Sequence, residues 1–408
     1  MKTDLDHLMS DRDLAAVIVV SEEHYNATRD YLTHGARVSG GFVVKPHGQP
    51  PVMVVNPMET EEAKASGLQV ISYSDLGYHD LVKQYGDQPG KLRAMWWQTI
   101  LRGVGITSGK VGVYGAGDLN IFIELFRQLE RELQGIQLVG EQGRTLFDEA
   151  MTTKDAAEIS RMRDVARKTN EVMALTWDYI AGHRALGEGV VNADGQALTI
   201  GMVRRFVRRE LLERDLEDTG MIFAQGRDGG FPHSRGQDRD ALQQGQAIVF
   251  DLFPREFGGG YHHDMTRTWC IGYAPAQIQE AYGQVIEAFD RALELTKVGA
   301  TGDLPQITVM DYFESLGHPT QRSKPGTSDG YTHSLGHGVG LNIHERPRLH
   351  HLFKDVLQAG SVVTIEPGLY YADQGYGIRI EDTVLLEPSG ALTNLTPFHK
   401  QLVLPLGG

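Results

Sequence analysis

Carboxylates and histidines gather after residue 250 in a pattern that suits metal chemistry. Asp251 is the only charged residue in an otherwise apolar run at 247–253, and Asp264 opens the next strand-like run after a glycine-rich loop. A carboxylate inside a doubly buried strand is costly unless something compensates it. Two carboxylates held close together cannot both stay ionised without a cation. The pair therefore predicts a cation site.

The spacing of the acidic residues suggests that two hairpins build this site. If the first hairpin is centred on its loop, residues whose numbers sum to 515 face each other, which places Asp251 opposite Asp264. A turn around 373–375 gives a sum of 747, which places Glu366 opposite Glu381. Residues directly opposite share a face, with Cβ atoms about 5 Å apart. We therefore expect two carboxylate pairs aimed at one point.

Three histidines lie within twelve residues of the segment THSLGHGVGLNIHERP at 332–347: His333, His337 and His344. The segment is not an HExxH zinc motif, because Arg348 stands where the second histidine is needed. Beside four carboxylates, these imidazoles indicate one ligand together with acid/base or substrate-binding groups. Four carboxylates and one imidazole suit a dinuclear site for manganese, cobalt, zinc or iron.

Such a site favours amide hydrolysis. Two metal ions about 3.5–4 Å apart would bridge a water and lower its pKa toward ~7, which supplies hydroxide at neutral pH. The metal ions would also polarise a carbonyl group. Neighbouring imidazoles can donate to the developing oxyanion and protonate a leaving nitrogen.

The elements that must position these residues follow from the hydrophobic pattern. Residues 1–147 read as an α/β unit, and a domain boundary is predicted near residue 148. Asp155, with Glu158 three residues later, predicts the cap of a long helix. The expected strands are 14–20, 52–55, 110–114, 247–253, 264–271, 361–371 and 377–386, and the expected helices are 121–133, 201–213 and 278–295.

Composition narrows the class of protein. The 408 residues carry 39 Lys+Arg against 53 Asp+Glu, a net charge of −14, which argues against a general nucleic-acid binder. A single cysteine, Cys270, excludes an intrachain disulfide or a cysteine-rich zinc module and fits a reducing compartment. The apolar run at 14–20 is too short to cross a membrane and follows acidic residues, unlike a signal peptide. We therefore expect a cytoplasmic protein with no membrane or nucleic-acid partner.

Four motifs resemble the pita-bread metallopeptidases, the family of aminopeptidase P, prolidase and methionine aminopeptidase. They are GYHHDMTRT at 260–268, HGVGLNIHE at 337–345, IEPGL at 365–369 and RIED at 379–382. The resemblance implies an α/β (α+β) chain with a pita-bread catalytic domain at 148–408. It also implies the metal ligands Asp251, Asp264, His337, Glu366 and Glu381.

The same resemblance implies further site residues and a substrate. Catalytic or substrate-binding roles are implied for His233, His333, His344, Glu366 and Arg379. Residues 1–147 resemble the amino-terminal domain of the creatinase, prolidase and aminopeptidase P branch, which implies cleavage of Xaa-Pro bonds in peptides or dipeptides. Two divalent ions, manganese first and cobalt, zinc or iron as alternatives, and a homodimer are also expected.

One departure and two alternatives remain. The step from Asp251 to Asp264 is 13 residues rather than the family's eleven, and Phe253 replaces the usual glycine, so substrate length and side-chain preference stay open. A metal-independent, creatinase-like amidinohydrolase is one alternative. A non-catalytic peptide-binding protein on the same fold is the other. Both are disfavoured because all five ligand positions are present.

Overall fold

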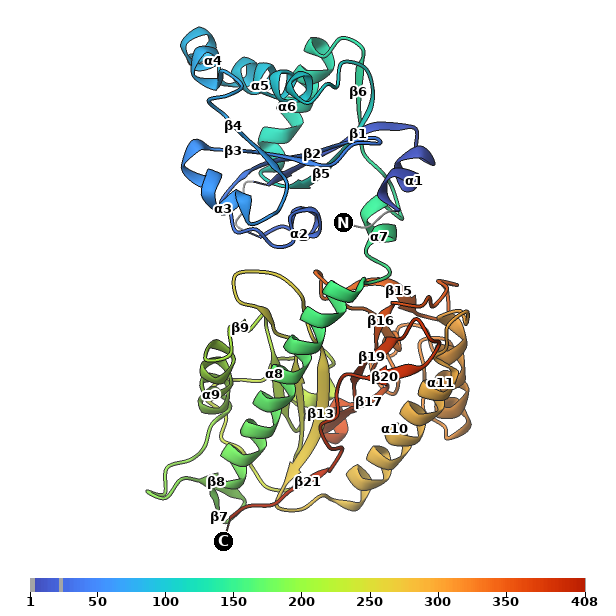
Figure 1. The fold of residues 1–408 in the computed structure, drawn as a ribbon. Helices are drawn as coiled ribbons and strands as arrows, with labels where there is room; N and C mark the ends of the chain where they lie inside the picture. The colour runs from blue at the N-terminus through green and yellow to red at the C-terminus, as the bar shows by residue number, and fades with distance from the viewer. Residues whose placement is uncertain (1–3, 22–24, 408) are drawn as a thin grey trace. The chain divides into compact units, whose positions relative to one another are not determined.

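The computed structural model describes residues 4–21 and 25–407, and the chain divides into two compact units (Figure 1). The N-terminal unit is Met1–Met151 with Gly258–Gly260, and the C-terminal unit is Thr152–Phe257 with Tyr261–Gly408. The boundary predicted at 147/148 falls inside helix α7 (Leu146–Ala150), which belongs to the first unit.

The N-terminal unit is built on one six-stranded mixed sheet in the order β4-β3-β2-β1-β5-β6. Helices α5 (Pro89–Gly103) and α6 (Leu119–Glu132) cover one face of it through Trp97, Ile100 and Leu129 (Figure 1). The predicted strands at 14–20, 52–55 and 110–114 are confirmed as β1, β3 and β5. The strand bounds are β1 Leu14–Ser21, β2 Gly41–Pro46, β3 Val52–Val55, β4 Gln69–Ser72, β5 Gly109–Ala116 and β6 Ile136–Val139.

The remaining helices of this unit are short. They are α1 (Leu5–Ser10), α2 (Ala27–Thr33), the 3-10 turn η1 (Pro57–Glu59), α3 (Thr60–Lys64) and α4 (Tyr78–Tyr85).

In the C-terminal unit, two helix pairs flank the strands (Figure 1). Helix α8 (Ala156–Ala181) begins at Asp155, whose carboxylate accepts from the backbone of Glu158 as the capping pattern predicts. It packs next to α9 (Ile200–Leu212), and its Trp177 lies edge-on to Trp269 with 5.4 Å between ring centroids. On the other side, α10 (Ala276–Leu295) packs against α11 (Asp303–Ser315), which the sequence pattern did not predict.

The strands of this unit form a four-stranded sheet, β10-β11-β13-β21, and a five-stranded sheet, β15-β14-β16-β19-β20. The pairs β17-β18, β12-β9 and β7-β8 stand beside them. The bounds are β7 Arg184–Leu186, β8 Gly189–Val191, β9 Leu216–Glu217, β10 Ile222–Gln225, β11 Ala247–Leu252, β12 Arg255–Glu256, β13 Met265–Ile271, β14 Gly336–Gly338, β15 Glu345–Leu349, β16 Val362–Ile365, β17 Gly368–Tyr371, β18 Tyr376–Arg379, β19 Asp382–Leu386, β20 Leu392–Asn394 and β21 Val403–Leu404.

Two predicted strands are each divided in two. The run 361–371 breaks at Glu366 and Pro367, and the run 377–386 breaks at Ile380 and Glu381. Proline has no N–H for the ladder, so the first break follows from the sequence. Both breaks fall at a predicted ligand, and each carboxylate therefore sits between two short strands.

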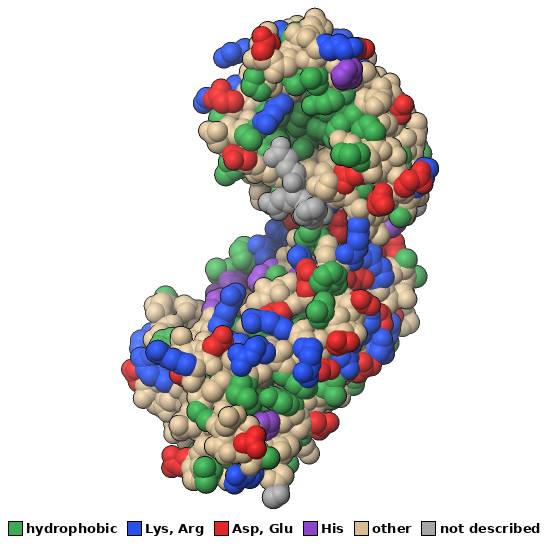
Figure 2. All heavy atoms as spheres, turned by 90° about the vertical axis from the view of Figure 1, so that its left-hand side faces the viewer, with side chains coloured by type: hydrophobic (Ala, Val, Ile, Leu, Met, Phe, Trp, Pro, Cys, Tyr) green, Lys and Arg blue, Asp and Glu red, His purple; other side chains and the backbone are tan. Residues whose placement is uncertain are grey.

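The face of the C-terminal unit that carries α9 is rich in arginine and lysine interspersed with acidic residues (Figure 2). Arg167 pairs with Asp164 at 2.7 Å, and Arg208 pairs with Asp218 at 2.8 Å. Part of this positive charge is therefore balanced by neighbouring acids. Over residues 4–21 and 25–407, no helix has the length and apolar character needed to span a membrane.

Candidate metal centre

The hairpin of β11 and β13 supplies the first carboxylate pair, but in a different register from the predicted one. Asp251 pairs with Thr266 and Leu252 with Met265, so facing residues sum to 517 rather than 515. The prediction that Asp251 lies directly opposite Asp264 is wrong. The loop is not a simple turn, because it contains β12 and a bridge between Arg255 and His262. A slip of two residues keeps Asp264 on the same face.

The second pair has the predicted register. Gly368 pairs with Arg379 on one side of the strand breaks, and Ile365 pairs with Asp382 on the other, and both pairs sum to 747. Glu366 and Glu381 lie between these two ladders at the same level. The main chain of Glu381 also bridges to Thr266 of β13, which joins the two hairpins.

The two hairpins and β14 bring ligand atoms together. One ligand atom each from Asp264, His337 and Glu381 lies within 4.8 Å of the others. His337 Nε2 is 3.7 Å from Asp264 Oδ2 and 3.4 Å from Glu366 Oε1. Asp251 is tied into the same network, because its charge raises the pKa of both Asp264 and Glu381. Asp264, His337, Glu366 and Glu381 therefore lie together, and Asp251 is close enough for its charge to act on two of them.

The donor set fits a bound cation. One oxygen each of Asp251, Asp264 and Glu381 is buried without a hydrogen-bond partner among the described residues. Burial, followed by the charges of neighbouring carboxylates, raises the pKa of Asp264 and Glu381 well above the ordinary values. Unpaired buried carboxylate oxygens and an imidazole are the ligands that a hard or borderline divalent ion takes.

Glu366 has a different environment. Burial alone would raise the pKa of its carboxyl group, but the hydrogen bond to His337 and the charges of His333, His337 and Arg379 outweigh burial and lower it to about 2. Glu366 is therefore the carboxylate of this group that stays ionised most readily.

A directed chain of hydrogen bonds runs beside the carboxylates. Arg379 Nη2 is 2.6 Å from Asp251 Oδ2, and its Nη1 donates to the Tyr370 hydroxyl at 2.9 Å. The Tyr370 oxygen is 2.8 Å from His333 Nε2, and His333 Nδ1 is 2.7 Å from the carbonyl of Ser334. A guanidinium only donates and a carbonyl only accepts. His333 therefore donates through Nδ1 and accepts at Nε2.

His337 and His344 face each other across the hairpin of β14 and β15. Their rings meet edge to face with 4.4 Å between centroids. Burial, and then the charge of His337, lowers the pKa of His344, which favours a neutral imidazole at pH 7. His344 remains an exposed residue, so it is accessible to a substrate.

His233 also belongs to this neighbourhood. The carbonyl of Pro232, just before it, accepts from Arg379 Nη1 at 3.2 Å. The charge of His233 contributes to the lowered pKa of both His333 and His344. His233 is therefore close enough to His333 and His344 for its charge to act on both.

Glu381 and its neighbour Asp382 lie in different electrostatic environments. Asp382 pairs with fully buried Arg267 at 2.9 Å and also binds Lys400 and Asn394. Glu381 instead accepts from the Thr266 hydroxyl at 2.7 Å. Successive residues of an extended chain point to opposite faces. The cations of the protein therefore neutralise one acid and leave the other to the metal centre.

Two residues of the site were missed from the sequence: Tyr370 and Thr266. Both lie inside the runs used to predict strands, Tyr370 four positions after Glu366 and Thr266 two positions after Asp264. Their place on the same face as Asp251 and Arg379 was the available signal. His262 and His263, left out of the ligand set, are buried, and burial lowers the pKa of each to about 3.

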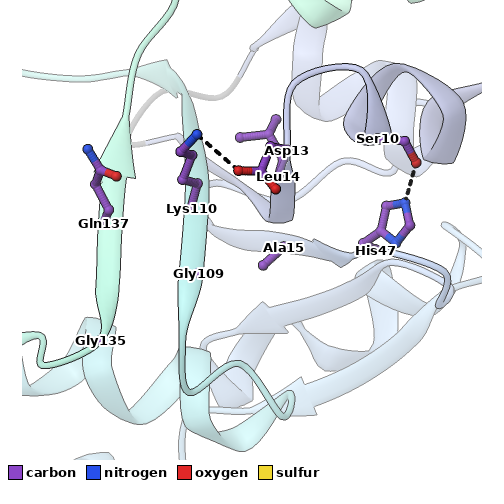
Figure 3. A pocket seen from close by; sticks show the side chains of 9 residues that line it. All are labelled: Ser10, Asp13, Leu14, Ala15, His47, Gly109, Lys110, Gly135 and Gln137. Atoms are coloured by element: carbon purple, nitrogen blue, oxygen red, sulfur yellow. Dashed lines mark hydrogen bonds and ion pairs between the residues drawn. The ribbon is translucent and has the colours of Figure 1, made fainter.

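A separate open pocket of about 560 Å³ lies in the N-terminal unit (Figure 3). Four of its polar lining residues pair with each other, since Lys110 binds Asp13 at 3.0 Å and Ser10 binds His47 at 2.9 Å. It contains none of the predicted site residues.

The chain is similar to known peptidases. Residues 160–388 match metallopeptidase family M24. An Xaa-Pro dipeptidase from Pyrococcus furiosus is 37% identical over 185 residues. The match covers 45% of this chain and 48% of that relative, about half of its length. An Xaa-Pro dipeptidase from Pyrococcus horikoshii is 29% identical over 302 residues, 70% of this chain and 81% of that one. The crystal structure of an X-Pro aminopeptidase from Thermotoga maritima superposes with a TM-score of 0.74 at 20% identity, covering 96% and 98% of the two chains.

Proposed function

The chain belongs to metallopeptidase family M24, and from that premise we propose that it is a dinuclear-metal peptidase that hydrolyses Xaa-Pro bonds. The observation that carries the proposal is the buried group of Asp264, His337 and Glu381 with carboxylate oxygens that lack partners. Similarity to the two Pyrococcus Xaa-Pro dipeptidases supports the proline specificity. The chain is a peptidase on a mixed α/β fold.

The proposed ligands are Asp251, Asp264, His337, Glu366 and Glu381. Divalent ions held there would lower the pKa of water and polarise the scissile carbonyl. Manganese is the proposed metal, because four carboxylates make an oxygen-rich ligand set. Glu366, ionised because its pKa is about 2, is available to accept the proton of the attacking water at Oε2.

The imidazoles then act on the substrate. His344 is exposed and neutral, so its N–H can donate to the oxygen of the scissile carbonyl as negative charge develops. His333 accepts at Nε2 from Tyr370, so it can donate in the same way only if its Nδ1–H exchanges the carbonyl of Ser334 for the substrate. His233 lies at the same site and could supply the proton that the prolyl nitrogen needs when it leaves.

Proline sets a specific demand on such a site. A peptide bond to proline has no N–H, and the ring restricts the preceding residue. A peptidase for it must therefore recognise ring shape and protonate a tertiary amide nitrogen. Arg379 takes the role of fixing Tyr370 and Asp251 rather than of meeting the substrate.

Hydrolysis of matched peptides tests the proposal. Protein loaded with Mn²⁺ should cleave Xaa-Pro dipeptides or peptides with an Xaa-Pro amino terminus, and should cleave the Xaa-Ala equivalents much more slowly. Equal turnover of both, or of neither, would defeat the proline assignment. A series from Xaa-Pro to longer peptides separates dipeptidase from aminopeptidase.

Size-exclusion chromatography with light scattering tests the proposed homodimer, which a monomeric mass would contradict.

A further inference from the structure

A buried ion pair lies under the turn that carries His344. Lys154 Nζ is 2.8 Å from Glu345 Oε2, and the two side chains are only 1% and 5% exposed. We propose that Lys154 is a positioning residue that holds His344 over the metal centre by fixing the carboxylate of Glu345. The inference rests on the proposed function only for the role of His344, because the geometry itself does not depend on the substrate.

The ion pair is costly to build and sits in a specific place. Removing two charges from water is unfavourable, and removing only one partner leaves an uncompensated charge. Lys154 is itself anchored, since its backbone N–H donates to the carbonyl of Gly360 at 2.8 Å. Its main chain is therefore anchored, and its buried ammonium group reaches the turn from that anchor.

Glu345 joins that fixed point to the turn. Its other oxygen, Oε1, accepts from the backbone N–H of Asn342 at 3.0 Å, three residues back. The backbone of Gly340 lies so close that an added Cβ would be 2.2 Å from Glu345 Oε2. One carboxylate thus bonds to the later part of the segment between β14 and β15 and lies close against its start.

The strand after the turn is secured independently. Asp355 binds Arg346 at 2.9 Å and Arg348 at 3.0 Å, so β15 stays in place without Lys154. The turn before it is held at its start, where the N–H of His262 donates to the carbonyl of Gly340 at 2.8 Å, and Glu345 holds its later part at Asn342. Loss of Lys154 is therefore expected to displace the turn, and His344 with it, more than the strand.

Position is what His344 needs for its proposed task. A displacement of about 1 Å in a catalytic group can reduce the rate by about 100-fold without affecting binding to the same extent. Lys154 pairs directly with Glu345, the residue next to His344, so we infer that it acts on His344 through Glu345. A positioning role predicts a loss in kcat with little change in KM.

The test compares K154M with K154R, E345Q and a matched control. K154M should lower kcat about 10- to 100-fold with KM changed by less than about threefold. K154R keeps the charge and should recover most of kcat. The control, K91M, removes a lysine paired with Glu132 at 2.9 Å in the N-terminal unit and should leave activity unchanged. E345Q should resemble K154M while keeping a side chain that can still accept from Asn342.

Combination with H344A separates positioning from general destabilisation. If Lys154 acts through His344, then adding K154M to H344A should lower kcat by less than about twofold, because coupled residues are not additive. An equal fractional loss in both backgrounds would overturn the inference. Full activity of a folded K154M protein would do the same.

A spectroscopic readout keeps the inference distinct from the proposed function. In metal-free protein, the imidazole NMR signals of His344, assigned with H344A, should move in K154M and stay in place in K154R. If the wild type cleaves no peptide but these signals move, the proposed function fails and the positioning role stands. If peptides are cleaved and the signals are identical in all variants, the positioning role fails.

Discussion

The substitution E381Q in the metal centre should have opposite effects on stability with and without bound metal. In metal-free protein, Glu381 and Asp264 place carboxylate oxygens within 4.8 Å of each other. At that separation two full charges repel by about 3.5 kcal/mol at an effective dielectric constant of about 20. Burial and neighbouring carboxylate charges raise the pKa of both groups, the charge of Glu381 acting on Asp264 and those of Glu366 and Asp251 acting on Glu381. E381Q removes one charge with little change in shape.

We expect E381Q to stabilise the metal-free protein. The glutamine oxygen can keep the bond from the Thr266 hydroxyl, and its amide can donate to the partnerless oxygen of Asp264. The gain should be about 1–3 kcal/mol, below the full repulsion because the wild type takes up a proton instead. For a unit of this size that corresponds to a rise in Tm of roughly 3–10 °C.

With metal the order should reverse. A ligand that binds only the folded state at 100 times its Kd stabilises by about 2.7 kcal/mol, and E381Q should lose most of that gain together with activity. The assay is thermal unfolding of both proteins with a chelator and with saturating Mn²⁺.

The control is E387Q, because Glu387 binds Arg163 and Thr393 rather than the metal centre. Its effect should be the same in both conditions. If E381Q lowers Tm equally with chelator and with metal, then the carboxylates do not repel one another in the folded protein and the reasoning is wrong.

Three further predictions concern other parts of the C-terminal unit. Y370F removes the hydroxyl that orients His333 and should lower kcat/KM about 10- to 100-fold, the loss expected when a hydrogen bond to a charged group is removed. The affinity for Mn²⁺, measured by calorimetry, should stay unchanged, and an equal loss of metal binding would contradict the prediction. D355N should cost about 1–3 kcal/mol at pH 7 in urea unfolding. Burial raises the pKa of Asp355, but the arginines that bind it outweigh burial and lower the pKa overall. The wild type therefore loses its extra stability over D355N as the pH falls below about 4 and through the lowered pKa. A difference in unfolding free energy that persists at pH 3 would refute this. G340A should destabilise the protein by about 1–3 kcal/mol because its Cβ would meet the Glu345 carboxylate. The control G283A, which has open space on helix α10, should stabilise it by about 0.5–1 kcal/mol. Similar changes in unfolding free energy for both variants would show that the contact at Gly340 is not tight.

The parts of the site that follow local rules could be predicted from the sequence. The pairing of Glu366 with Glu381 depends on a short turn, which the structure closes at Gly375 with a φ of +77°. Strands with period-two patterning and a simple turn leave little freedom in register. The capped start of α8 at Asp155 was predictable for the same reason, since its bonds join residues three apart.

The parts that depend on longer connections could not be predicted. The loop between Asp251 and Asp264 forms a strand of its own that pairs with β9, so the register could not be taken from loop symmetry. The bonds from Arg379 to Tyr370 and to Pro232 join segments up to 147 residues apart. The pairing of Lys154 with Glu345 spans 191 residues. No spacing rule within one segment encodes these contacts.

The charge balance of the metal centre depends on the strand register at the adjacent residues Glu381 and Asp382. A slip of one residue would turn every side chain of the strand to its other face. Asp382 would then enter the metal centre on a shorter arm, and Glu381 would meet Arg267 and Lys400 and become a salt bridge. Every residue needed for a ligand set would still be in the sequence, yet the centre would lose its charge balance. The bond from the Thr266 hydroxyl to Glu381, and that from Asn394 to Asp382, each recognise one of the two acids and so act as a check on alignment during folding.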